Sequence, residues 1–548
     1  MSLPRSITVG GKEIPVPVTL GDRFAYWRNP EAGLARWQAR ARLAIAGGYS
    51  GADRTRRANQ LGWRREMDAA TAILPDLGTL REESQDLARN NGIASGALAL
   101  NVTKVVGRGL VPKAQIDRQL LGLSDEQADA WERQAEREFH LAADTVEIDA
   151  ERKLPFGLLQ GLAFLRTLED GDILVNLPRI TRPGSPYRLK LELIEAARLS
   201  NPDWLPDTDR RAGGVTTDEH GAPVTYHVCN RHPGNRRRTG DGSASFSWSA
   251  LKAFDSAGRP LCLHLYDKRR PGQPRGVPYL APVIELIKQL GRYTDAEVMA
   301  AVVNGMFSVF IESDIAGAQV GWSPAPNIGN PDGDAALQTD PTGLELGYGS
   351  VVELPAGMRA NTAAPGRPNQ AFDGFVLAVL RQIGMALELP YEVLIRHFST
   401  SYSASRAALE EAWDYFLRRR HWLAVSLCQP VYEAILGEAI ARGRLQAPGF
   451  GADPLITRAW LGSLWIGEAP SALDPVKEIE AAERRVALRL TSRSEERSRL
   501  VGGDWEACLP QIAREEQAIR THGLQPVEPK APAAMNEPES EEDDDAID

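Results

Sequence analysis

Cysteine is scarce in this chain of 548 residues. The four cysteines, Cys229, Cys262, Cys428 and Cys508, lie far apart and form no CxxC pair. A disulfide framework or a zinc knuckle needs paired or closely spaced cysteines. The spacing therefore argues against both kinds of scaffold and favours a reducing compartment such as the cytosol.

Long hydrophobic runs are also missing. No stretch of about 18 uncharged apolar residues occurs, so the sequence predicts no membrane span. The segment from Met1 to Leu20 carries three prolines and no apolar core of the kind found in secretory signals, so we expect no such signal there.

The short motifs of common enzyme classes are absent as well. The sequence contains no GxxxxGK[ST] phosphate loop, no GxGxxG after a strand, no HExxH and no GxSxG elbow. An ATPase role is therefore unsupported. We predict a protein with no catalytic residues, no cofactor and no bound metal.

Two groups of residues were weighed against that prediction. His220, His227, Cys229 and His232 lie close in sequence, but their spacing matches no standard zinc pattern, and a strand with polar surface residues and a buried cysteine explains them better. Asp170 and Asp172 flank Gly171, which is compatible with paired carboxylates. A turn that leads into a strand is the interpretation we favour.

A basic surplus is lacking too. Of the formal net charge of −10, residues 524–548 contribute −8 through nine acids and one lysine, which leaves −2 for residues 1–523. Static DNA-binding proteins usually show a strongly basic face. Two local basic runs remain, Arg236–Arg238 in a Gly/Ser-rich loop and Arg418–Arg420 on a predicted helix. The first is a possible phosphate contact or a solvated loop tip, and the second is expected to pair with nearby acids at helical spacing.

The first half of the chain reads as mixed α and β structure. Residues 1–75 predict short helices in a partly mobile arm, and 76–100 a helix broken at Gly92 and Gly96. The run from Val102 to Val111 predicts a strand and turn. Ser124 with Gln127 forms a capping box for a helix to about Leu141, and a second helix is expected over 156–168. Alternating apolar residues then predict strands near 173–177, 189–193, 224–228 and 261–265.

The second half is more helical. Apolar residues at helical spacing predict a long amphipathic helix over 279–304. Residues 313–368 are rich in Pro, Gly and Asp and indicate loops around short strands, one of them at 349–354. Helices are expected over 372–387, 403–443 with a kink at Pro430, 474–490 and 504–519. The proline-rich, acidic tail at 524–548 is predicted to be disordered.

Several segments, in order along residues 20–510, resemble the lambda-like bacteriophage portal protein family, the head–tail connector portals. They include Arg89-Asn90-Asn91-Gly92-Ile93, Asp170-Gly171-Asp172-Ile173, the run from His264 to Pro278, Leu389-Pro390-Tyr391-Glu392-Val393-Leu394 and Ser401-Tyr402-Ser403-Ala404-Ser405-Arg406. Each segment alone is weak, and their shared order carries the resemblance. One departure is Ser401, where the family pattern has Asn before the tyrosine.

The resemblance implies an α+β portal-type fold with a mixed α/β wing, long stem helices and a mainly helical C-terminal crown. The expected divisions are an arm at 1–75, a wing at 76–278, a stem helix at 279–312, a clip-like segment at 313–368, a second stem or tunnel helix and loop at 369–400, a crown at 401–523 and the acidic tail at 524–548. It also implies a homo-oligomeric ring, usually of twelve subunits, at one vertex of a viral capsid. Double-stranded DNA would enter and leave the head through this ring without sequence-specific contacts.

Further partners implied by the resemblance are a terminase, scaffold, major capsid protein and head-completion proteins, with assembly in the host cytoplasm and no membrane. Candidates for facing DNA in the channel are Lys288, Arg292, Arg359 and Arg367; surface or intersubunit ion pairs are the competing role. Two other functions stay open at this point. One is another structural or adaptor protein of a phage head, and the other is a hydrolase with an unrecognised site.

Overall fold

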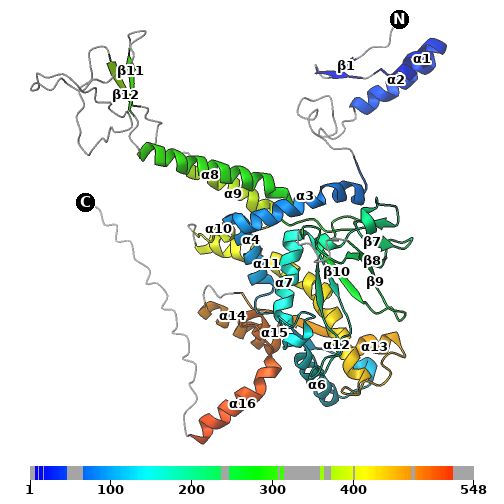
Figure 1. The fold of residues 1–548 in the computed structure, drawn as a ribbon, viewed down its shortest axis with the longest axis vertical. Helices are drawn as coiled ribbons and strands as arrows, with labels where there is room; N and C mark the ends of the chain where they lie inside the picture. Colours follow the sequence, from blue (N-terminus) through cyan, green and yellow to red (C-terminus); the bar gives the residue numbers. More distant parts are fainter. Residues whose placement is uncertain are drawn as a thin grey trace, which may run out of the picture. The chain divides into compact units, whose positions relative to one another are not determined.

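The computed structural model describes residues 6–9, 12–16, 18–45, 66–235, 246–305, 309–313, 358–362, 372–398, 402–470 and 475–522 (Figure 1). The chain forms two compact units, residues 1–71 and 72–548, which are treated separately below. The predicted strand at 349–354 and the acidic tail at 524–548 lie outside the described residues.

The N-terminal unit holds a hairpin and two helices. Strands β1 (Ser6–Val9) and β2 (Lys12–Pro15) pair in antiparallel register, and helices α1 (Leu20–Arg28) and α2 (Pro30–Ile45) follow. Thr19 and Asp22 cap α1, because the Asp22 carboxylate accepts hydrogen bonds from both the backbone and the hydroxyl of Thr19 at 2.9 and 2.6 Å. The prediction of short helices in this region is therefore confirmed.

The second unit opens with two helices, α3 (Ala69–Asn90) and α4 (Gly92–Val105). They are separated at Asn91, whose side-chain oxygen accepts from the Ile93 and Ala94 amides at 3.0 and 3.1 Å. The predicted break at Gly96 is wrong, and so is the strand beginning at Val102, because residues 102–105 complete α4. Burial explains the second error: Val105 is fully buried in the core, and packing overrides its preference for strands.

The next segment follows the sequence signals closely. Strand β3 (Val111–Ala114) and the short helix α5 (Arg118–Leu121) lead to α6 (Asp125–Ala143), where Ser124 and Gln127 form the predicted capping box. Helix α7 (Phe156–Asp170) matches its prediction to within two residues. A turn at Gly171, with φ +94°, connects it directly to the first strand of the central sheet.

Two antiparallel sheets follow. The first has the order β10–β4–β5, with β4 (Asp172–Asn176) between β10 (Cys262–Tyr266) and β5 (Glu192–Glu195). The second is a meander of β6 (Arg211–Ala212), β7 (Val215–Thr217), β8 (Pro223–Cys229) and β9 (Trp248–Lys252). The register places Leu174 between Ile194 and His264. Alternation of apolar residues thus located β4, β8 and β10 correctly.

Two long helices run antiparallel beside each other (Figure 1). They are α8 (Ile284–Gly305) and α9 (Phe372–Ala386). At the base the Tyr279 hydroxyl donates to the Leu387 carbonyl at 2.5 Å, and farther along Tyr293 stacks on Phe372 with 5.7 Å between ring centres. Beyond these helices, β11 (Val309–Ser313) pairs with β12 (Met358–Thr362) in antiparallel register. The two predicted helices are confirmed. Strand β12 lies within the irregular segment that was predicted to hold short strands, whereas β11 lies at its boundary.

A helical layer completes the core. Helix α10 (Tyr391–Ile395) precedes α11 (Tyr402–Leu423), a π-helical turn (Ala424–Cys428) and α12 (Gln429–Ala441). The irregularity expected at Pro430 therefore lies just before the proline. Residues 404–441 form the one helical stretch among the described residues that is long and apolar enough to cross a membrane, but 56% of its most apolar window is buried inside the protein. Tyr432 and Ile435 have no exposed surface, as expected for a core helix.

The C-terminal part of the chain pairs with an early strand of the second unit. After α13 (Pro454–Trp460), strand β13 (Ser463–Ile466) pairs with β3, some 350 residues earlier. Helices α14 (Pro475–Ala487), α15 (Arg493–Leu500) and α16 (Trp505–Thr521) follow. One apolar core joins α4, α6, α7, α8, α9, α11 and α12. The bases of the two long helices are thus anchored in the same core as the mixed α/β half.

Candidate functional site

The most buried polar cluster surrounds Asp172 at the start of β4. The guanidinium of Arg275, 2% exposed, donates to both carboxylate oxygens at 2.5 and 3.0 Å. Arg81 from α3 donates to one oxygen at 2.9 Å, and His264 lies 3.1 Å from the other. The amide of Gly276 adds a further donor at 3.1 Å. Four segments of the chain therefore meet on one carboxylate.

The charges in this cluster compensate each other. Burial alone would raise the pKa of the Asp172 carboxyl, but Arg275 and Arg81 outweigh it and hold the pKa well below its usual range. Burial lowers the pKa of His264, which keeps this imidazole neutral, and burial together with the charge of Arg275 lowers the pKa of Arg81 to about 10. The cluster is an ionised aspartate held by two arginines.

Arg275 also ties three carbonyls to the cluster. It donates to the backbone oxygens of Ala196, Leu199 and Gly213 at 2.6–2.7 Å. Its neighbour Gly276 packs so tightly that an added Cβ would lie 1.9 Å from the Gly171 oxygen. The cluster is therefore a structural joint in which all groups are engaged with each other, and its geometry offers no open acid or base for catalysis.

Asp170, the second carboxylate of the pair, faces a different set of partners. It accepts from Gln85 at 2.8 Å and from Arg166 at 2.7 and 3.0 Å. The two aspartates thus hold separate cations on either side of Gly171. The favoured interpretation, a turn leading into a strand, is confirmed, and the paired-carboxylate alternative is wrong because neither group is free to exchange a proton with a substrate.

The three arginines of the run 418–420 point to three different places. Arg418 pairs with Glu388, and Arg419 lies 3.3 Å from Asp267. Arg420 is buried and donates to the carbonyls of Lys104, Val105 and Glu468 at 2.9–3.0 Å. Arg420 thereby caps the C-terminal end of α4, where a cation is favoured. The expected pairing with acids at helical spacing is wrong; among the described residues Glu410 pairs with Arg406 instead.

The predicted channel residues are only partly described. Lys288 lies on α8, 3.2 Å from Glu83 of α3, with both side chains more than a third exposed. Arg292 lies one turn farther along α8 and is exposed. The side chains of Arg359 and Arg367, and all of Arg236, Arg237 and Arg238, fall outside the described residues. The structure therefore brings two of the seven candidates onto one helix.

The histidine and cysteine group does not converge. The His227 ring lies 2.9 Å from the Thr216 hydroxyl, and His232 lies 3.8 Å from Glu195. His220 is exposed and Cys229 is buried. Within the part of the chain that the structure describes, no three His, Cys, Asp or Glu side chains are placed to share a metal ion.

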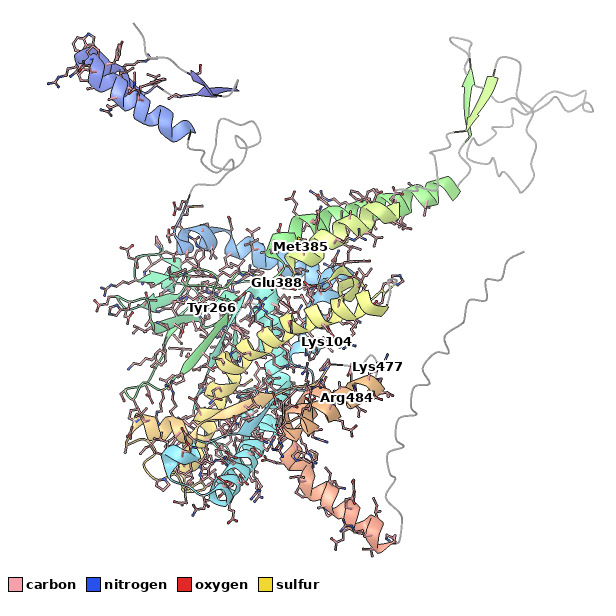
Figure 2. All side chains as sticks on the ribbon, turned by 180° about the vertical axis from the view of Figure 1, so that it is seen from behind. Lys104, Tyr266, Met385, Glu388, Lys477 and Arg484 are labelled. Carbon is pink, nitrogen blue, oxygen red and sulfur yellow. The ribbon has the colours of Figure 1, made fainter. Side chains whose placement is uncertain are left out.

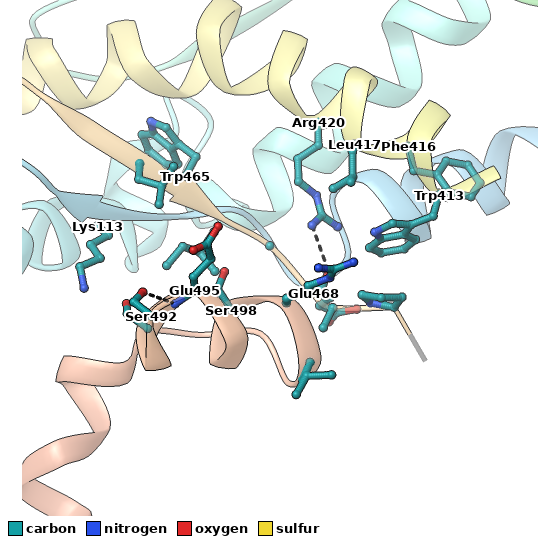
Figure 3. Close-up of a pocket in the computed structure, with 18 of the residues that line it drawn as sticks. Lys113, Trp413, Phe416, Leu417, Arg420, Trp465, Glu468, Ser492, Glu495 and Ser498 are labelled. Atoms are coloured by element: carbon teal, nitrogen blue, oxygen red, sulfur yellow. Dashed lines mark hydrogen bonds between the residues drawn. The ribbon is translucent and has the colours of Figure 1, made fainter. Parts of the chain in front are cut away.

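A large open groove lies beside the β3–β13 pair (Figure 3). Its volume is about 1590 Å³, and it is bounded by α11, the β3–β13 sheet, α14 and α15. Its apolar lining includes Trp413, Phe416, Leu417, Leu464 and Trp465 (Figure 3). Lys104 and Lys477, both labelled in Figure 2, also line it. Acidic and basic side chains line it in equal number, eight of each. This surface suits an amphipathic protein segment better than a small charged substrate.

Reasoning from sequence missed the groove and the role of Arg275. The segment containing Arg275 was singled out by the resemblance but received no role. A buried arginine gives no local sequence signal, because its partner Asp172 lies about 100 residues away. The available signal was that both segments, Asp170–Asp172 and Gln273–Gly276, resemble the same family although they lie far apart in the sequence.

Comparisons with known proteins place the chain. Residues 55–420 match the family model described as phage portal protein, lambda family. The chain is 27% identical over 490 residues to the portal protein of Escherichia phage N15, covering 85% of this chain and 89% of that protein. It is 26% identical to portal protein B of Escherichia phage lambda, covering 83% and 86%.

A solved structure described as the neck of an empty gene transfer agent particle is similar at 13% identity, with a TM-score of 0.43, over 76% of this chain and 92% of that one. The family match extends over two thirds of the sequence and includes Asp172 of the buried joint and its two arginines, Arg81 and Arg275. The chain therefore belongs to the lambda family of phage portal proteins.

Proposed function

We propose that the chain forms a closed ring, with twelve copies the expected number, through which double-stranded DNA is packaged into and ejected from a phage head. The observation that carries the proposal is the antiparallel pair α8–α9. A ring of identical subunits needs head-to-tail interfaces between two different surfaces of the same chain. Long helices with apolar residues on an exposed side supply such a surface.

Helix α8 exposes apolar side chains near its far end. Val298 and Met299 are each 64% exposed, and Val302 is 49% exposed. They lie three and four residues apart and so share one face of the helix. The opposite side of α8 is covered by α9 through Tyr293, Phe372 and Phe375. In the proposed ring, the exposed face packs against the neighbouring subunit.

Charge supports a sliding contact with DNA. A channel that bound the polyanion through many cations would release many counterions and hold it tightly. Residues 1–523 carry a formal charge of only −2, and the cations proposed to face the channel on α8 are few, Lys288 and Arg292. The proposed divisions of the chain are a wing at 76–278, a stem at 279–312 and 369–400, a clip at 313–368 and a crown at 401–523.

The proposed role is structural, which the packed joint around Asp172 and the open groove beside β3 and β13 support. As part of a virion, the ring is proposed to sit at a capsid vertex and to bind terminase, scaffold, major capsid and head-completion proteins. Assembly in the host cytoplasm is part of the same proposal.

The ring is tested by native mass spectrometry and electron microscopy of the full chain at micromolar concentration. We expect rings with a central hole. Burying two valines per interface contributes about 3 kcal/mol, so Val298→Asp with Val302→Asp weakens each contact at least a hundredfold and yields monomers. The matched control is Val224→Asp on β8, which is 49% exposed and lies outside the proposed interface. A strictly monomeric wild-type protein would contradict the proposal.

A further inference from the structure

Most of helix α16 is exposed to solvent. From Gln511 to His522 every side chain is exposed except Ile512 and Ile519, which are half-buried. Its first turn is held to the body through Lys113, which lies 2.7 Å from Asp504 and 3.3 Å from Glu506. An isolated helix of this length is marginally stable in water, and most helices in proteins are stabilised by packing one apolar face. The last three turns of α16 therefore need a surface to pack on.

The apolar residues of α16 form one stripe. Leu509, Ile512 and Ile519 are separated by three and seven residues and thus lie on the same side of the helix. Leu509 is 42% exposed. The flanks of the stripe are charged and carry both signs, with Arg514 and Glu515 as examples. This pattern is typical of a helix that docks into an apolar groove with a charged border.

The groove described above has this character. Leu417 on α11 and Leu464 on β13 are 42% and 51% exposed although both line a concave surface. Leaving two large apolar side chains and parts of Trp413 and Trp465 in water costs free energy that a docked segment would recover. The mixed charges at its border, among them Asp414, Glu495 and Arg499, match a partner that carries both signs.

The groove is also accessible to a helix. The projecting part of α16, residues 511–521, is about 16 Å long. The groove is open and is lined by side chains of α11, β13, α14 and α15, so a short helix can enter it from solvent. Glu506, in the first turn of α16, lines the groove of its own chain. The rest of the helix runs away from α14 and α15 (Figure 1). The vacant groove and the projecting helix on one chain are the two unlike surfaces of a head-to-tail contact.

We propose that α16 of one subunit docks in this groove of the neighbouring copy, with Ile512 and Ile519 facing Leu417 and Leu464. This rests on the proposed ring, and it adds a second interface, away from α8, that links each subunit to the next through an exchanged helix. The contact is heterologous, so every subunit has both its helix and its groove occupied only when the ring is complete.

Disulfide trapping tests the contact in the full chain. Cys508 is changed to Ser to remove the half-exposed native thiol, and Ile512→Cys is combined with Leu417→Cys. After mild oxidation we expect a ladder on non-reducing gels in steps of one chain mass, 59.9 kDa. The matched control pairs Leu417→Cys with Ala518→Cys, on the opposite side of α16, and is expected to run mainly as a single chain.

The other outcomes are distinguishable. A disulfide within one chain would show that α16 folds onto its own groove, and dimers formed by Ile512→Cys alone would show helices pairing with each other. Either result overturns the inference, as does a chain that stays uncrosslinked in rings that native mass spectrometry finds intact. A wild-type protein that forms no rings fails the proposed function instead, and that is measured on the same samples before oxidation.

Discussion

Replacing Arg275 with Met is the sharpest test of how the mixed α/β half is held together. Methionine matches the apolar stem of arginine but lacks the guanidinium group, so it removes the charge and every donor. Asp172 would keep only Arg81, His264 and the Gly276 amide. The carbonyls of Leu199 and Gly213 would lose the Arg275 donor, whereas the Ala196 carbonyl would keep the Leu199 amide at 3.2 Å. Removing one partner of a buried ion pair costs about 3–5 kcal/mol, and each orphaned buried acceptor adds about 1 kcal/mol or more.

The total cost, about 5 kcal/mol or more, is comparable with the stability of a whole domain. Because a chain of this size does not unfold in one step, we measure local opening by native-state hydrogen exchange of the β4 and β10 amides. A loss of 5 kcal/mol corresponds to exchange several thousandfold faster. Arg275→Lys keeps the charge but offers one compact donor group in place of a planar fork, so we expect it to recover less than half of the loss.

The result that would refute this reasoning is a small effect. If Arg275→Met accelerated exchange in β4 less than about tenfold, the buried joint would contribute little and its geometry would not explain the stability of the sheet. The pair Asp172→Leu with Arg275→Met gives a further check, since replacing both partners of a buried ion pair is often nearly neutral. We expect the double variant to be more stable than either single one.

Two further predictions concern the joint and the C-terminal helices. Gly276→Ala forces apart β4 and the segment before α8, because the new methyl would overlap the Gly171 backbone at 1.9 Å; we expect a loss of about 3 kcal/mol or more in thermal unfolding, whereas Gly374→Ala, whose methyl meets nothing within 4 Å, is tolerated. The Arg485 guanidinium lowers the pKa of Glu496 from 4.5 to about 2, so the stability from this pair is complete above pH 4.5 and is lost as the pH falls toward 2. Since Arg485 is partly exposed, we expect the pair to stabilise the fold by about 1–2 kcal/mol. Glu496→Gln lacks this contribution, so the hydrogen-exchange protection of the α14–α15 amides is expected to decline less steeply on acidification in the variant than in the wild type. Equal acid sensitivity in the variant and the wild type would contradict the second prediction.

Local signals predicted local structure well. Ser124 and Gln127 predict the start of α6 by a hydrogen-bonding pattern within four residues. Apolar residues at alternate positions located β4, which pairs with β10 on one edge and β5 on the other. Failures occurred where distant packing decided. Val102 and Val105 are β-branched, which favours a strand, yet they lie in the last turn of α4, because Val105 is buried in the core and Val102 packs against it. The pairing of β3 with β13 joins segments about 350 residues apart and has no local signature.

The candidate site shows the same division more sharply. Asp170–Asp172 and the segment with Arg275 were recognised separately from their residues, but only the fold shows that one carboxylate joins them. Arg420 was expected to pair with nearby acids at helical spacing. In the structure its guanidinium is buried and donates to the carbonyls at the end of α4. A run of arginines in the sequence therefore does not show which of its side chains is buried.

Channel-facing residues are harder still, because the property belongs to the assembly. Lys288 pairs with Glu83 within one chain, but both side chains keep more than a third of their surface in water, so the pair is weak enough to open toward another partner. Arg292, one turn along α8, shares its exposed side with Asp295. A nearby acid of this kind weakens the grip of each cation on a phosphate, and a loose grip is what a sliding polyanion requires. If α8 lines the proposed channel, its few cations would meet DNA in the presence of competing acids from their own chain, as loose binding requires.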